Sequence, residues 1–256
     1  MCSSDLPADA VRARNFYRDG ADETPYGQKV DENHLARCWA EVKKGGAWER
    51  RRTEVEAFNR ANPVIKRGLG LFPLKFGISF NVPHLNQAGA LVHVYTDGSI
   101  RLNHGGTEMG QGLFVKVAQI VADEFQIDVA RVQITGTTTG KVPNTSPTAA
   151  SAGADLNGMA AQAAARAIKS RLVEFCAGEF KVSPEAVVFH DSKVRVGNAD
   201  HDFAEIVRRA YFARVSLSAT GFYKTPKIWW NEAEARGRPF YYFTYGVGAT
   251  EVEIDT

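Results

Sequence analysis

The segment from about Thr148 to Cys176 restricts the possible folds of this chain more than any other feature. It is rich in alanine, the best helix former, and predicts one long helix. Because the side chains of such a helix are small, other backbones can approach it closely. The chain has 256 residues, of which 44% are hydrophobic. A chain of this size removes about 70–75% of its extended-chain surface from water, as one large domain or two modest ones.

Further helices and strands are predicted from the spacing of the apolar residues. Helical spacing marks four more segments: Leu35–Val42, Trp48–Phe58, Leu113–Val121 and Asp202–Tyr211. Sequence typical of extended strands occurs in seven segments: Gly68–Val82, Ala90–Tyr95, Ser99–Leu102, Val132–Ile134, Val187–Phe189, Val194–Val196 and Val215–Tyr223. Asp97-Gly98, between two of these strands, is a strong hairpin signal. The predicted fold class is α+β, with mostly antiparallel strands and packed helices.

The sequence is polar and helix-prone up to about Asn62, and after Pro63 it becomes typical of extended strands. We expect residues 1–63 to form a helical N-terminal lobe and residues 64–256 to form part of an α+β domain truncated at its C-terminus. Residues 1–6 resemble translated sequencing-adapter readthrough and receive no structural role. At the other end, the strand-like segment Tyr241–Ile254 runs into Thr256 without a turn signal. We therefore hypothesise that the chain is an internal piece of a longer protein.

Charge and cysteine content exclude several classes of protein. Lys and Arg number 31 against 29 acidic residues, a net charge of +2, whereas proteins that coat nucleic acid carry clustered positive charge. Cys2, Cys38 and Cys176 are far apart, so we expect no disulfide framework, zinc ribbon or cysteine-ligated cluster. No apolar run approaches the roughly 20 residues of a membrane helix, and the start lacks the features of a signal peptide. We expect a cytoplasmic protein that binds neither nucleic acid nor membrane.

The most informative stretch runs from His104 to Gly112, between a predicted strand and a predicted helix. Its glycines permit positive φ and allow a bulky group to lie against the backbone. The first N–H groups of the helix, near Gln111, Gly112 and Leu113, would form an anion site. On spacing alone, a tight turn that needs glycine only for its geometry is slightly favoured, because glycine-rich turns are common. Glu108 is interpreted as a loop carboxylate bonded to backbone or solvent, not as a general base.

A second helix start is predicted at Ser146, a good N-cap, with Pro147 at the first helical position. The unpaired donors would then be the N–H groups of Thr148, Ala149 and Ala150. A well-capped helix without a ligand remains the alternative. The chain contains no Walker loop, dinucleotide fingerprint, zinc-hydrolase motif or Gly-x-Ser-x-Gly elbow. Two such helix starts are compatible with a bound polyanion or oxo group, and both readings remain open at this point.

Several long, ordered motifs resemble the molybdenum-binding subunits of the xanthine oxidase family, most closely xanthine dehydrogenases of the bacterial two-subunit type. The resemblance extends from about Ala8 to Thr256. The segments that carry it are Lys75–Phe80, Leu85–Ala90, Gly105–Gly112, Val142–Ser151, Ser216–Tyr223 and Phe240–Gly246. It implies the molybdopterin-binding α+β domain of a molybdenum hydroxylase, which oxidises hypoxanthine and xanthine to urate with water as the oxygen source.

The resemblance also implies roles for individual residues. Gly110, Gln111 and Gly112 would contact molybdopterin, as would Ala149, Ala150 and Ser151, with the Ala150 backbone near molybdenum. No side chain would ligate the metal, because the cofactor's dithiolene holds it. Phe80 would stack on the substrate. Asn81 stands where many members have threonine beside the substrate, so substrate preference is open.

Other parts of such an enzyme are implied as well. FAD and 2Fe-2S clusters would be carried by a partner subunit in a hetero-oligomer. The family's general base is a glutamate in a Gly-Glu motif beyond Thr256, so no catalytic residue is expected within this chain, which would be inactive alone. Two alternatives are an aldehyde or other N-heterocycle hydroxylase of the same family, and a non-catalytic module that binds phosphate or a nucleotide.

Overall fold

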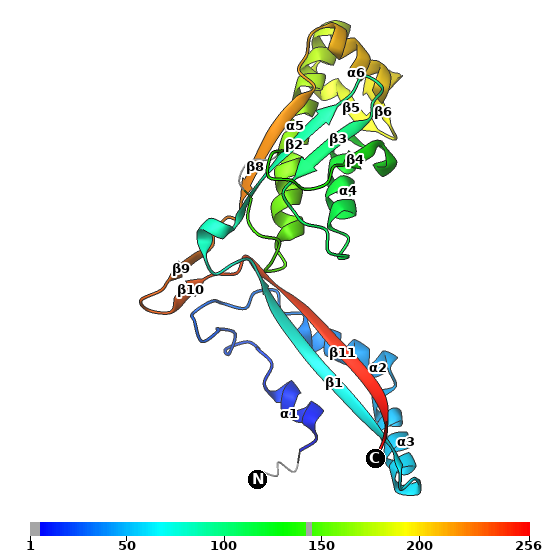
Figure 1. Cartoon of the computed structure of the whole chain (residues 1–256), viewed down its shortest axis with the longest axis vertical. Helices are drawn as coiled ribbons and strands as arrows, with labels where there is room; N and C mark the ends of the chain where they lie inside the picture. The colour runs from blue at the N-terminus through cyan, green and yellow to red at the C-terminus, as the bar shows by residue number, and fades with distance from the viewer. Residues whose placement is uncertain (1–5, 142–144) are drawn as a thin grey trace. The chain divides into compact units, whose positions relative to one another are not determined.

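The computed structural model describes residues 6–141 and 145–256 (Figure 1). The helices are α1 (Ala8–Arg14), α2 (Leu35–Gly45), α3 (Trp48–Ala61), α4 (Leu113–Phe125), α5 (Gly153–Phe180) and α6 (Phe203–Phe212). The strands are β1 (Ile65–Ile78), β2 (Gln87–Val94), β3 (Ile100–His104), β4 (Val132–Ile134), β5 (Val187–His190), β6 (Lys193–Val196), β7 (Ala199–Asp202), β8 (Ser218–Lys224), β9 (Trp229–Asn231), β10 (Arg236–Arg238) and β11 (Tyr242–Asp255). The predicted α+β class is confirmed, and β3–β4 is the parallel pair among antiparallel ones.

The chain forms two compact units. The sheet unit comprises Ser79–Pro226, and the ribbon unit comprises the residues up to Ile78 together with Lys227–Thr256. This division differs from the expected boundary at 63/64, because β1 pairs with β11 along its whole length and so joins the N-terminal helices to the last strand. Such a pairing between segments so far apart in the chain leaves no local signal in the sequence.

The sheet unit is built on a four-stranded sheet in the order β4-β3-β2-β8, against which α5 packs (Figure 1). The close approach expected of the alanine-rich helix is confirmed at Gly221 of β8. A Cβ added there would stand 2.0 Å from the carbonyl oxygen of Ala160 and 2.5 Å from the backbone nitrogen of Ala164. The small residues of α5 therefore let β8 lie directly on its backbone.

Local signals placed several elements correctly. In the β2–β3 hairpin, Gly98 has a φ of +80° and the Asp97 side chain accepts the N–H of Ser99, as its turn sequence predicts. Asp202 caps α6 by accepting the N–H of Ala204 at 2.8 Å. The predicted hairpin 187–196 is present, and β7 extends it into a three-stranded sheet that the sequence did not predict.

Some boundaries were wrong. The long helix begins at Gly153 with Ala152 as N-cap, not near Thr148, and continues to Phe180. Ala150 and Ser151 have φ values of +52° and +54°, which a right-handed helix does not accommodate. The strand predicted over 68–82 is β1 at 65–78, and the one predicted over 215–223 is β8 at 218–224.

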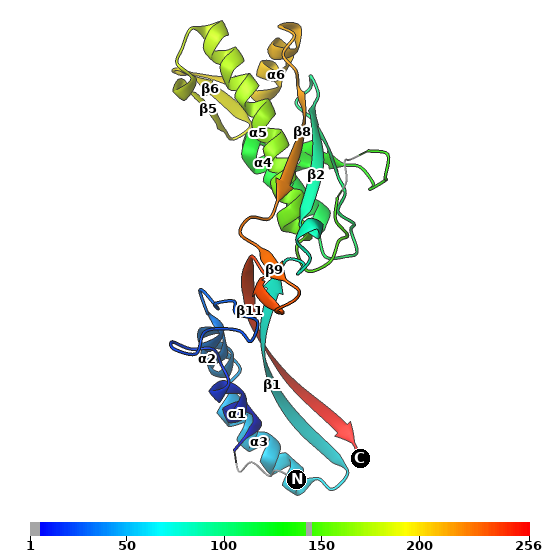
Figure 2. The ribbon, with the colours of Figure 1, turned by 90° about the vertical axis from the view of Figure 1, so that its left-hand side faces the viewer.

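The ribbon unit contains the β1–β11 ribbon, the small β9–β10 pair and the helices α1, α2 and α3. The three helices lie on one side of the ribbon (Figure 2). Its core joins Trp39 of α2, Trp48 of α3 and Leu71 of β1, all less than a tenth exposed. In the described part of the chain, no helix is long and apolar enough to cross a membrane.

Candidate functional site

The loop before α4 and the turn before α5 line one cavity of about 440 Å³ in the sheet unit. The two segments singled out in the sequence therefore meet at a shared hollow. Lys116 is the one charged residue among the described residues that line it. The full lining is Met109, Gln111, Leu113, Lys116, Thr148, Ala149, Ala150, Ser151, Gly153 and Ala154.

Glu108 organises the loop before α4. Its Oε1 accepts the N–H groups of Gly110 at 2.9 Å and Gly112 at 3.0 Å, and its Oε2 accepts that of Phe114 at 3.0 Å. The bond from Phe114, followed by those from Gly112 and Gly110, lowers the pKa of Glu108. The interpretation of Glu108 as a backbone-bonded carboxylate is confirmed. The expectation that the Gly112 N–H is free was wrong, because this carboxylate occupies it.

Gln111 closes the same loop with its side-chain amide. Its Oε1 accepts the Met109 N–H at 2.5 Å, and its Nε2 donates to the Thr107 carbonyl at 2.9 Å. Nε2 carries a second hydrogen that this bond does not use, and Gln111 lines the cavity. Gly110 and Gly112 allow the loop to turn, because their φ values are +95° and +74°. A Cβ at either position would stand in open space. They shape the loop but do not line the cavity.

The turn before α5 differs from the expected capped helix. Ser146 does not cap it, because the Ser146 hydroxyl donates to the Gln87 carbonyl at 3.0 Å. The Ala149 N–H, expected to be free, donates to the Pro147 carbonyl. Thr148 joins the two loops, since its hydroxyl oxygen accepts the Thr107 N–H at 2.8 Å.

The helix donors lie a few residues further along than expected. Because α5 starts at Gly153 and α4 at Leu113, the N–H groups of Gly153, Ala154 and Leu113 have no partner inside their own helices. All three residues line the cavity. Left-handed Ser151 precedes right-handed Ala152, an alternation that turns successive N–H groups towards one concavity. The cavity wall thus offers backbone donors, two helix starts and one ammonium group.

His104 and Asn157 are buried polar residues beneath these loops, both less than 5% exposed. The His104 Nδ1 accepts the Gly106 N–H at 3.1 Å, so its ring carries hydrogen on Nε2 in the neutral form. Burial lowers the pKa of His104 to about 4. A Cβ on Gly106 would stand 2.7 Å from the Asn157 amide nitrogen, so glycine is needed there for close packing. His104 begins the stretch that the sequence singled out, but its burial was not predicted, and Asn157 was not singled out.

Phe80 and Asn81 do not line this cavity. Phe80 is half-buried, Asn81 is exposed, and the N–H of the preceding Ser79 donates to the Ala150 carbonyl at 3.4 Å. Asn86 holds the Phe80 backbone on both sides, accepting its N–H at 2.8 Å and donating to its carbonyl at 2.9 Å. The structure therefore anchors Phe80 next to the turn that carries Ala150.

The structure brings together Gln111, Ala149, Ala150 and Ser151 of the predicted site. Leu113 and Thr148, which were named as helix-start donors, line it as well, and so does Met109 of the glycine-rich stretch. The structure adds three residues that the sequence did not single out: Lys116, Gly153 and Ala154. Lys116 had a weak signal, since it lies in the first turn of a helix that follows a glycine-rich loop. Val142 to Asn144 of the predicted motif lie outside the described residues. Within the described residues, no group of three His, Cys, Asp or Glu side chains could hold a metal ion.

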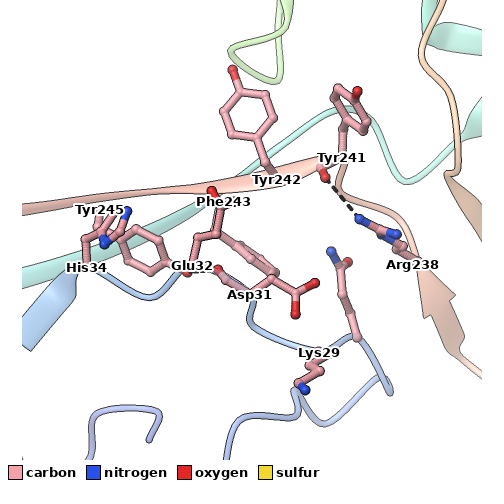
Figure 3. Close-up of a pocket in the computed structure, with 10 residues that line it drawn as sticks. Lys29, Asp31, Glu32, His34, Arg238, Tyr241, Tyr242, Phe243 and Tyr245 are labelled. Carbon is pink, nitrogen blue, oxygen red and sulfur yellow. Dashed lines mark hydrogen bonds between the residues drawn. The ribbon is translucent and has the colours of Figure 1, made fainter.

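A second cavity, of about 320 Å³, belongs to the ribbon unit (Figure 3). Arg238 donates to the Tyr241 carbonyl at 3.5 Å on one wall. Asp31 and Glu32 stand on the wall beside Tyr245, and burial followed by these two charges raises the pKa of that tyrosine. The wall of this cavity carries both signs of charge, because Lys29 and Arg238 stand with Asp31 and Glu32. The described lining of the sheet-unit cavity has an ammonium group and no carboxylate, so it is the better anion site.

Comparison with known proteins agrees with this geometry. Residues 41–256 match the family model of the molybdopterin cofactor-binding domain. Xanthine dehydrogenase/oxidase is 48% identical over 250 residues in Mus musculus and 46% in Felis catus, covering 98% of this chain in each case. The chain spans 17% of the length of these relatives. The crystal structure of quinoline 2-oxidoreductase from Pseudomonas putida 86 shares the fold, with a TM-score of 0.77 at 22% identity over 98% of this chain and 32% of that one.

The matched region includes both loops that line the cavity and the segment around Phe80. The family model covers most of the chain and names the cofactor, and the relatives at nearly half identity align with the same region. The chain belongs to the molybdopterin cofactor-binding domain family, in the molybdenum-binding region of the xanthine oxidase family of oxidoreductases.

Proposed function

We propose that the cavity between the α4 loop and the α5 turn holds the molybdopterin cofactor. The observation that carries this proposal is that Gln111 and the Ala149–Ser151 turn line the same hollow. Gly110 and Gly112 take part indirectly, by shaping the loop that presents Gln111. The Ala150 backbone would lie near the molybdenum end, as the resemblance implies.

The residues of the cavity fit such a group. A pterin with a phosphate and a metal–oxo end requires several hydrogen-bond donors and some positive charge. The wall supplies the Gln111 amide, the N–H groups of Gly153 and Ala154, and the Lys116 ammonium, and no carboxylate is among its described lining residues. The Gln111 amide and the backbone donors would hold the pterin, and Lys116 would stabilise the phosphate.

The proposed reaction is the oxidation of hypoxanthine and xanthine to urate. In each step a C–H bond of the purine becomes a C–O bond with oxygen from water, releasing two electrons and two protons. When bound, the molybdenum cofactor supplies the redox centre that accepts these electrons. A partner carrying 2Fe-2S clusters and FAD passes them on in a hetero-oligomer. We assign no general base to this chain.

The chain's own contribution is to position the substrate. Phe80 offers its half-buried ring to the purine face, where offset stacking contributes about 0.5–1.5 kcal/mol beyond area burial. Asn81 is exposed next to it, and its amide can both donate to and accept from the purine edge. An amide at this position is the feature of the chain that bears most directly on substrate preference.

The test uses a chimera, defined as the mouse xanthine dehydrogenase/oxidase with its aligned segment replaced by this chain. We expect the chimera to contain molybdenum and pterin and to oxidise xanthine. Lys116→Gln should reduce bound pterin about tenfold, the effect of losing a charged hydrogen bond. Lys193→Gln is the control, because Lys193 is an exposed lysine of β6 that does not line the cavity.

The outcomes separate the alternatives. Oxidation of aldehydes or other heterocycles without xanthine turnover would replace the purine assignment by another hydroxylase of the family. A folded chimera that binds inorganic phosphate but contains no molybdenum would instead indicate a non-catalytic module. Equal pterin content in Lys116→Gln and the unmodified chimera would contradict the assigned role of Lys116.

A further inference from the structure

One face of the β1–β11 ribbon is apolar and exposed. Residues directly opposite each other in an antiparallel pair lie on the same face, and Phe72, Leu74 and Phe76 of β1 alternate with residues that point the other way. Val252 and Ile254 of β11 lie on the same face as these three. Phe72 is 63% exposed and Ile254 is 54% exposed. We call these five side chains the ribbon face.

The opposite side of the ribbon is covered and charged. Leu71 packs there against Trp39 and Trp48. The ion pair Arg67–Glu253, at 3.0 Å, belongs to the same side. In Figure 2 the helices α1, α2 and α3 all lie on this side of the ribbon. The ribbon unit therefore has one covered face, and its second face carries large apolar side chains that the described residues of this unit leave exposed.

The ribbon face carries almost no charge. Lys66 is the one charged residue of β1 and β11 on it, and its ammonium group bonds the backbone carbonyls of Asn59 and Asn62 at 2.7 and 2.5 Å. An exposed apolar surface free of ionic groups is typical of a protein interface. The chemistry of the face thus selects an apolar occupant over nucleic acid or an acidic peptide.

The shape of the face also fits a packed polypeptide. Gly248 lies opposite Phe72 and Gly246 lies opposite Leu74, so hollows alternate with large side chains. A Cβ at Gly70 or at Gly248 would meet nothing within 4 Å. In the described residues β1 and β11 form a sheet of two strands, so each has an open edge. Long open edges next to an apolar face are surfaces that natural proteins cover.

We propose that the ribbon face is an internal interface of the assembled molybdenum hydroxylase, covered by apolar polypeptide of the same enzyme. The length of the relatives supports this occupant, because the chain spans only 17% of them. The inference rests on the proposed function only for the identity of the occupant. A second copy of this chain is the competing occupant, and the test separates the two.

The test compares one set of substitutions in two settings, the 256-residue chain and the chimera. Gly70→Leu fills an open hollow, and Phe72→Lys places a charge on the face. Gly178→Leu is the matched control, since Gly178 of α5 also faces open space. In the 256-residue chain we expect a monomer by sedimentation and no fall in the urea midpoint for Gly70→Leu or Phe72→Lys, because both sites are exposed. Gly70→Leu should raise the midpoint slightly, because glycine in a strand loses more backbone entropy on folding.

In the chimera, Gly70→Leu and Phe72→Lys should each lower the yield of soluble, native-mass enzyme about tenfold or more, as overpacking of a closed interface does. Gly178→Leu should assemble normally. Normal assembly of both face variants would overturn the proposal. So would a wild-type 256-residue chain that dimerises and becomes monomeric with Gly70→Leu, since the occupant would then be a second copy.

Two further outcomes are covered by the design. If the unmodified chimera does not assemble, leucine and lysine are introduced into the mouse enzyme at the positions that align with Gly70 and Phe72, and the variants are judged by the same criterion. If the chimera assembles without molybdenum or xanthine turnover, the proposed function fails. The comparison of assembly yields still decides whether the ribbon face is an interface.

Discussion

Gly221 of β8 lies so close to Ala160 of α5 that an added Cβ would stand 2.0 Å from the Ala160 carbonyl oxygen. Backbone occupies both sides of this contact, so no flexible side chain can move away. We expect Gly221→Ala to reduce the free energy of unfolding by about 1–3 kcal/mol, the range for overpacked cores. Urea unfolding followed by circular dichroism measures it.

The control for this substitution is Gly178→Ala. Gly178 lies within α5 where a Cβ meets nothing within 4 Å. Alanine there should raise the free energy of unfolding by about 0.5–1 kcal/mol, because glycine loses more backbone entropy in a helix. Equal effects of the two substitutions would contradict the contact between β8 and α5.

His104 should make the protein less stable in mild acid. Burial lowers its pKa from an ordinary 6.5 to about 4, so between these values the unfolded chain binds a proton that the folded protein does not. Stability therefore falls as pH drops through 6.5 and levels off below the folded pKa. The loss between about pH 7 and about pH 5 should be about 2 kcal/mol.

Urea unfolding at several pH values checks this expectation, with His104→Gln as the comparison. Glutamine can accept the Gly106 N–H but does not titrate, so this part of the pH dependence should disappear. NMR titration gives a direct reading of the ring. A His104 imidazole that protonates near pH 6.5 in the folded protein would refute the assignment.

Glu108 should stabilise the loop before α4 in its ionised form. Its pKa is lowered by the N–H groups of Phe114, Gly112 and Gly110, so its contribution is present above the unfolded pKa and is lost as pH falls through the folded one. Glu108→Gln should lower the urea midpoint at neutral pH, and the difference should shrink in acid. A difference independent of pH would mean that ionisation does not matter. Asp191→Asn is a control, as an exposed loop carboxylate at another site.

Asn86 should matter for the position of Phe80. The Asn86 side chain bonds the Phe80 N–H, the Phe80 carbonyl and the Val82 carbonyl, and it is 2% exposed. Loss of these bonds in Asn86→Ala should cost about 2–3 kcal/mol of stability. In the chimera it should raise the KM for xanthine more than it lowers molybdenum content. Asn86→Asp keeps the acceptor for the Phe80 N–H and should have a smaller effect on KM.

Elements with local causes were predictable from the sequence. The apolar spacing of residues 35–42 and 48–58 marked α2 and α3, and Asp97-Gly98 marked its hairpin, because neighbours in the chain decide these structures. The start of α5 was missed because Ala150 and Ser151 are left-handed, a conformation alanine does not prefer locally. A contact from Ser79, far away in the chain, holds the Ala150 carbonyl.

The candidate site was predictable in its location but not in its details. Glycine-rich and serine-rich helix starts indicated two anion sites, and the structure places Gln111 and Ala149–Ser151 around one cavity. Which backbone N–H groups remain available to a ligand depends on side chains that accept hydrogen bonds from these loops. Glu108 takes the Gly112 donor and Thr148 takes the Thr107 donor, and neither pairing follows from spacing.

The carboxylate of Glu108 has a consequence for how such a protein matures. With an anion of its own at the start of α4, the protein can close the Thr107–Gly112 loop before any cofactor arrives. At the pterin site that we propose, this part of the wall is then built during folding, and little conformational entropy of the loop remains to be lost on binding. Folding and cofactor insertion can therefore proceed as separate steps, with insertion the later one.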